Sequence, residues 1–159
     1  MRRLLFSIGM VLSIGDAFGQ VGTAVVTIPS SVAFAVTNVN NATTGSPNPV
    51  TVSYNTAILV TGQRLQFSVQ ADTATFAAPA GGGTIPASNI SWTTSNAAGG
   101  TGSNGTLSGS TFVLVYQSNA YGVTPIAGSV DLTFTLAAPG SSIRAGVHSL
   151  TMRWKIEAI

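Results

Sequence analysis

The sequence predicts an all-β fold, a single Ig-like antiparallel β-sandwich of about eight short strands preceded by a signal peptide. Three observations predict it. Val, Thr, Ser, Gly and Asn are abundant, whereas Glu and Lys, which favour helices, are scarce. Apolar and polar residues alternate in short runs, as in strands with one buried and one solvated face. Turn-forming Gly, Pro and Asn separate these runs.

The first nineteen residues have the pattern of a signal peptide. A basic Met1–Arg3 is followed by the apolar Leu4–Gly15, and the small residue Gly19 ends the segment. A membrane span needs about 20 apolar residues, and this shorter run is followed by Asp16. We therefore expect cleavage after Gly19, a single domain over residues 20–159, and a secreted or cell-surface location, extracellular or periplasmic, in a bacterium.

The absence of cysteine excludes a disulfide framework, so burial of apolar side chains must stabilise the domain. The part of the chain after Gly19 is long enough for one packed core and short for two.

Eight alternating runs supply the expected strands. In chain order they are residues 24–28, 32–36, 50–54, 64–70, 90–93, 112–116, 130–136 and 150–156. The apolar positions within each run are two residues apart and so lie on one face of a strand. The first four runs place on that face Ala24, Val26 and Ile28; Val32, Phe34 and Val36; Val50, Val52 and Tyr54; and Leu65, Phe67 and Val69. The last four place there Ile90 and Trp92; Phe112, Leu114 and Tyr116; Val130, Leu132, Phe134 and Leu136; and Leu150, Met152, Trp154 and Ile156. We expect Phe67, Trp92, Phe134 and Trp154 in the core.

Polar and glycine-rich segments join the strands. We expect loops over Asn38–Pro49, Ala77–Ala87, Asn96–Ser110 and Ala137–Gly146. None of them indicates a domain boundary, because the runs on either side need each other's apolar faces.

The charged residues argue against an enzyme. Of the ten charged side chains three lie before residue 20, which leaves seven and one histidine, His148. A Ser–His–Asp triad would need His148 and Asp131, but no serine lies in a nucleophile elbow. We therefore expect a partly buried, structural His148 at a strand start. A glycosidase needs two opposed carboxylates, and Asp72, Asp131 and Glu157 lie in distant segments. We predict no catalytic residue.

No cofactor, metal or nucleic-acid site is expected either. Calcium needs several clustered oxygen ligands, and zinc would find one possible ligand here, His148, and no thiolate. The few cations could neutralise few phosphates, which argues against nucleic acid as a partner. No membrane span is expected once the signal peptide is removed.

One aromatic residue is a candidate for ligand contact. Trp92 and Trp154 lie on the same strand faces as the other apolar residues and are expected in the core. Tyr121, in the loop Ser118–Gly122, is the aromatic residue we expect to be exposed, and an exposed aromatic ring can stack on a sugar.

The C-terminal segment Ile143–Ile156 carries a resemblance to a known class. Its glycine, short polar step and alternating strand resemble the closing strand of secreted bacterial surface β-sandwiches, namely fimbrial subunits, spore-coat-type pilus domains and WxL domains. The segment departs from these families, because Trp92 and Trp154 do not form Trp-x-Leu motifs and a fimbrial cysteine pair is missing. The resemblance implies an extracellular structural or adhesive module.

The sequence therefore favours a non-catalytic surface module that assembles with itself or with other surface proteins or glycans. The alternative is a glycan- or small-ligand-binding β-sandwich that uses Tyr121 and the loops Ala77–Ala87 and Asn96–Ser110. A candidate for assembly is the uncharged run Ala24–Ile28, which ends at Pro29. It either pairs within its own chain or adds to the sheet of a neighbour.

Overall fold

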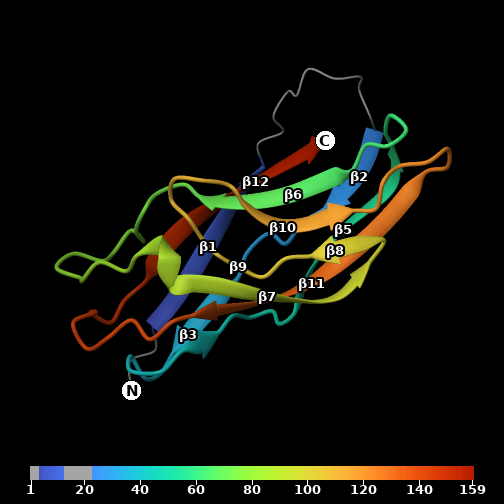
Figure 1. Cartoon of the computed structure of the whole chain (residues 1–159). Helices are drawn as coiled ribbons and strands as arrows, with labels where there is room; N and C mark the ends of the chain where they lie inside the picture. The colour runs from blue at the N-terminus through green and yellow to red at the C-terminus, as the bar shows by residue number, and fades with distance from the viewer. Residues whose placement is uncertain (1–3, 13–22) are drawn as a thin grey trace.

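The strands of the chain form two sheets. The computed structural model describes the backbone of residues 4–12 and, with side chains, residues 23–159. Within these residues there are two six-stranded sheets, here called A and B (Figure 1). Sheet A has the order β3 (Ala33–Val36), β1 (Leu4–Leu12), β12 (His148–Ala158), β6 (Leu65–Ala71), β10 (Val113–Ser118) and β8 (Gly100–Gly102). Sheet B has the order β2 (Thr23–Thr27), β5 (Val50–Ile58), β11 (Ile126–Leu136), β7 (Ile90–Ala98) and β9 (Gly105–Thr106), and β4 (Thr43–Thr44) also pairs with β11. A single 3-10 turn, Ala87–Asn89, precedes β7 in the described part of the chain.

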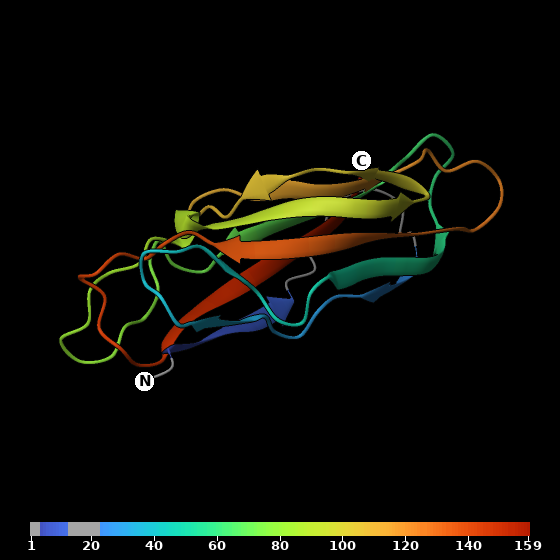
Figure 2. The ribbon, with the colours of Figure 1, turned by 90° about the horizontal axis from the view of Figure 1, so that it is seen from below.

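The two sheets share one core. Figure 2 shows strands of sheet B, such as β7 and β11, in front of the red β12 of sheet A. The Tyr54 ring of β5 lies 5.9 Å from the Phe67 ring of β6 and 6.0 Å from the Tyr116 ring of β10, so aromatic contacts join the sheets. Contacts of this kind add to the free energy gained by burying the rings.

The all-β prediction is confirmed. Each of the eight alternating runs overlaps a strand of the structure. The predicted core residues Phe67, Trp92, Phe134 and Trp154 are all at most 2% exposed. The alternation therefore identified the buried face of the strands correctly in these cases.

Two local predictions are wrong. Asn96–Ser110 is not a continuous loop, because it contains the end of β7 and the short strands β8 and β9. In β10 the register shifts between Leu114 and Tyr116. This bulge buries the neighbours Val115 and Tyr116 together and breaks the expected alternation, and Phe112 is exposed.

Strand β1 was not expected. It lies in the segment predicted to be a signal peptide, and it pairs in parallel with β12 and antiparallel with β3. The predicted cleavage site at Gly19 lies outside the described residues. Among the residues that are described, no helix is long and apolar enough to cross a membrane.

Candidate functional site

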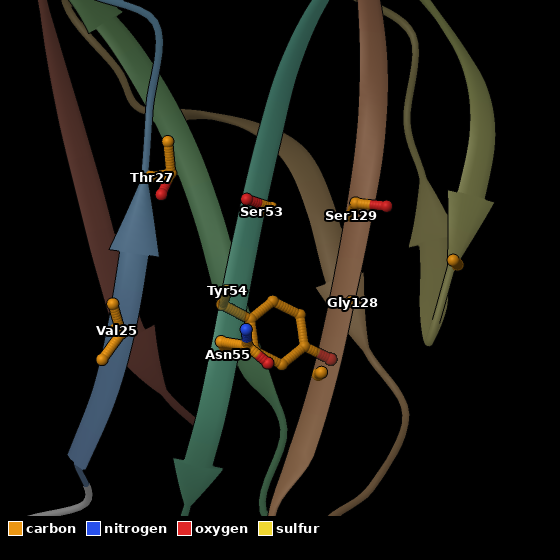
Figure 3. Close-up of a pocket in the computed structure, with 9 residues that line it drawn as sticks. Val25, Thr27, Ser53, Tyr54, Asn55, Gly128 and Ser129 are labelled. Atoms are coloured by element: carbon orange, nitrogen blue, oxygen red, sulfur yellow. The ribbon is translucent and has the colours of Figure 1, made fainter.

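An open depression of about 430 Å³ lies on sheet B over β2, β5 and β11 (Figure 3). It is lined by Val25, Thr27, Ser53, Tyr54, Asn55, Ala98, Ala127, Gly128 and Ser129. Strand pairing aligns three of these residues, because Ser53 of β5 is opposite Thr27 of β2 on one side and Ser129 of β11 on the other. The result is a row of three hydroxyl-bearing residues across three strands, which we call the hydroxyl row.

A glycine allows two tyrosines to pack beneath this depression. A Cβ on Gly128 would lie 2.5 Å from the Tyr116 hydroxyl and 2.7 Å from Cε1 of Tyr54. The Tyr116 hydroxyl donates a hydrogen bond to the Ala98 carbonyl at 2.7 Å, and the Tyr54 hydroxyl donates to the Gly99 carbonyl at 3.3 Å. Burial raises the pKa of Tyr116, which favours the protonated phenol that donates this bond. Both tyrosines therefore hold the site together.

The lining suits a neutral polar partner. Its polar side chains are the exposed Thr27 and Asn55 and the half-buried Ser53 and Ser129, and among the described residues that line it there is no carboxylate, ammonium, guanidinium or imidazole group. Hydroxyl and amide groups both donate and accept hydrogen bonds. The lining therefore offers hydrogen-bond donors and acceptors of the kind that another backbone or a sugar presents, and its described residues include no pair of groups for general acid–base catalysis.

The carboxylate of Asp131 in β11 is held by side-chain hydrogen bonds. Its oxygens accept hydrogen bonds from Thr51 Oγ1 at 2.5 Å and from Asn96 Nδ2 at 2.9 Å. These hydrogen bonds lower the pKa of Asp131 because they favour its charged form, and the bond from Thr51 has the largest effect. Asp131 thus ties β11 to both neighbouring strands, β5 and β7.

The other carboxylates are held in separate ion pairs. Asp72, which follows β6, pairs with Arg153, and Glu157 pairs with Lys155 at 2.7 Å in β12. Asp131 lies in sheet B, so the structure does not bring it together with the other two carboxylates. Across the described residues, no group of three or more His, Asp or Glu side chains could hold a metal ion.

His148 is buried more deeply than expected. It is 0% exposed at the start of β12, and its Nε2 lies 3.1 Å from the Arg144 carbonyl oxygen. Its strand belongs to sheet A, whereas Asp131 belongs to sheet B and binds Thr51 and Asn96. The structure therefore does not bring His148 and Asp131 together as a triad would require.

The expected exposure of Tyr121 is wrong. Tyr121 is only 9% exposed, and its backbone is tied down, because its N–H donates to the Gln63 carbonyl and its carbonyl accepts from the Gly62 N–H. The segment that contains Tyr121 lies at one end of the molecule, and the loop 77–87 lies at the other. Ligand contact by Tyr121 stays a prediction, but the loop 77–87 does not form one site with it.

The hydroxyl row was missed in the sequence. Thr27, Ser53 and Ser129 are each polar positions beside apolar ones, and nothing in the sequence distinguishes them from many other Ser and Thr residues. Only the strand order places them side by side.

No protein-family model matches this chain, and no curated protein matches its sequence.

Proposed function

We propose that this protein is a non-catalytic structural subunit of an extracellular assembly, such as a surface layer, pilus or matrix. In this proposal the N-terminal segment directs export, and residues 20–159 form a single Ig-like β-sandwich at the cell surface or in the medium. The observation that carries the proposal is the uncharged, exposed edge strand β2.

Strand β2 is open to pairing with another chain. It lies at the edge of sheet B, where β5 is its neighbour in the described sheet. Four of its five residues are exposed, and Val25 is 65% exposed. Natural proteins usually protect such edges with lysine, proline or a bulge. Here there is a register shift near Thr23, but there is no charge on the strand.

The partner that best fits this edge is a second copy of the chain. Backbone pairing along an edge strand needs an extended partner with few charges, and this chain is itself rich in such strands. The hydroxyl row lies beside the edge and is also neutral, so a chain arriving there meets no opposing charge. Other surface proteins or glycans are further partners in this proposal.

Electron microscopy and sedimentation of the exported protein test this function. The expected result is fibres, sheets or discrete oligomers of the purified protein that persist on dilution. A protein that stays monomeric at millimolar concentration would reject an assembly role.

The depression of sheet B favours one alternative, a glycan-binding module. Its hydroxyl row and Asn55 offer hydrogen bonds to a neutral sugar. Glycan-array binding that is lost in Ser53→Ala and Asn55→Ala, and kept in Ser110→Ala on another surface, would support that alternative.

A further inference from the structure

The strand predicted to be cleaved is a central strand of a sheet. β1 lies between β3 and β12 in sheet A (Figure 1). Among the described strands, β3 is joined to the rest of sheet A only through β1. If residues 1–19 are removed on export, β3 loses its strand partner in that sheet and β12 gains an open edge.

The open edge would be an apolar one. In β12 the residues that pair with alternate positions of β1 are His148, Leu150, Met152 and Trp154, and each is at most 3% exposed. On the other side, Phe34 and Val36 of β3 also pair with β1 and are at most 1% exposed. Removal of β1 would uncover one side of six buried residues. The unpaired backbone N–H and C=O groups along both edges would also need new partners.

We propose that a strand from a second copy of the chain fills this gap, and that the donated segment is Gln20–Ile28. This inference rests on the proposed export and assembly. It names the acceptor, the gap between β3 and β12, and the donor, the segment that begins at the predicted cleavage site.

The donor segment fits the gap in length and pattern. β1 has nine residues, and Gln20–Ile28 also has nine. Ala24, Val26 and Ile28 alternate with Thr23, Val25 and Thr27, so one face of the second half of the segment can cover the core, and the smaller or polar Gly22 and Gln20 continue that face at its start. The segment has no charged residue that would have to be buried.

Detachment of the donor segment from its own sheet costs little burial. In the described part of the segment Val26 and Ile28 are partly buried against the core, and Ala24 is exposed. Pro29 follows the segment, and the buried Val32 fixes the chain again just before β3. The segment can therefore leave sheet B while the rest of the core stays in place.

The same segment cannot fill the gap of its own chain. Ser7 of β1 is opposite Ala33 of β3, and β1 continues beyond that pair to Leu12. A hairpin that turned back through residues 29–32 would place Ile28 opposite Ala33, at the position of Ser7. The positions of residues 8–12, which pair with residues 150–154 of β12, would stay empty. A second copy has no such constraint.

Donation in this direction leads to an open assembly. Each copy would offer one donor segment and one gap, on different parts of its surface. Contacts between unlike surfaces continue from copy to copy unless a ring closes. The expected product is a fibre.

Disulfide trapping tests the proposal, because the chain has no cysteine of its own. The donor variant is Val25→Cys, and the acceptor variants are Ser149→Cys and, separately, Thr151→Cys. Val25 points to the opposite face of its strand from Val26, which would cover the core. Ser149 and Thr151 alternate with buried residues of β12. The three cysteine side chains should therefore face solvent in the filled gap. Donor and acceptor variants are exported from the same cells, oxidised, and analysed by non-reducing gel and by mass spectrometry.

The expected result is a dimer linked through Val25→Cys and one of the acceptor cysteines, formed when the two variants are co-exported and absent from either variant alone. A multimeric protein linked only between two Val25→Cys copies would overturn the inference and leave the proposed function standing, because it shows edge-to-edge pairing of β2. A monomer without cross-links would overturn both. An exported protein whose mass includes residues 1–19 would also overturn the inference, because β1 would then fill its own gap.

Discussion

At the scale of single residues, Trp154 is the clearest test of the core. It is 0% exposed in β12, whereas its neighbour Arg153 is half exposed and pairs with Asp72 at the surface. Trp154→Ala should lower the free energy of unfolding by about 3–5 kcal/mol, the usual range for a buried large aromatic side chain. Arg153→Ala should lower it by at most about 1 kcal/mol. Equal losses in chemical denaturation would show that the register of β12 is wrong.

Gly128 tests the packing beneath the depression. A methyl group there would lie 2.5 Å from the Tyr116 hydroxyl and 2.6 Å from the Ala98 carbonyl oxygen. Gly128→Ala should therefore destabilise the fold by about 1–3 kcal/mol, as overpacking usually does. Gly122→Ala is the matched control, because a Cβ there meets no atom within 4 Å. A Gly128→Ala protein as stable as the control would contradict the described contact of β11 with the tyrosines.

Asp131 makes the stability of the fold depend on pH in the acid range. Its pKa is lowered in the folded chain by the bonds from Thr51 and Asn96. A lowered pKa stabilises the fold above the unfolded value of about 3.9, and this contribution is lost as the pH falls through the folded value. Asp131→Asn should therefore show a smaller loss of stability below about pH 4 than the unaltered protein. Identical acid-unfolding curves would contradict this role.

The sequence could predict which residues face the core, but not which strands are neighbours. Alternation correctly placed Trp154 and Phe67 inside, because a strand's period of two is a local property. It could not show the bulge at Leu114 that buries both Val115 and Tyr116. Nor could it show that Tyr121 is buried, because its segment is held by backbone bonds to Gln63 and Gly62, which lie far from it in the sequence.

At the scale of elements, β2 is the strand through which assembly is expected. Ala24 is exposed, so a lysine there should leave the fold intact, but its charge would oppose pairing with another chain. Ala24→Lys should abolish assembly and keep the melting temperature nearly unchanged. Ala120→Lys, at an exposed position outside the strands, is the control and should assemble normally. Normal assembly of Ala24→Lys in sedimentation would contradict the role of β2.

The candidate site also depends on the arrangement of elements. Thr27, Ser53 and Ser129 belong to segments far apart in the sequence, and they meet only because β5 lies between β2 and β11. The position of β1 in sheet A could not be predicted from the sequence either. An apolar run of this kind is typical both of a signal peptide and of a buried strand, and periodicity does not separate the two.

At the scale of the whole molecule, the fold has two sheets, few charges and two loop-rich ends. The carboxylates of the described residues lie in separate ion pairs or hydrogen bonds. The features left for interaction are an uncharged edge strand, a neutral depression beside it, and the gap that β1 would leave. All three suit contacts between chains.

The most direct test of the proposed role is the mass of the exported protein, first denatured and then native, with electron microscopy of the same sample. The account predicts a subunit that begins at Gln20 and a native particle that contains many copies. A subunit that begins at Gln20 and stays monomeric at millimolar concentration would contradict it.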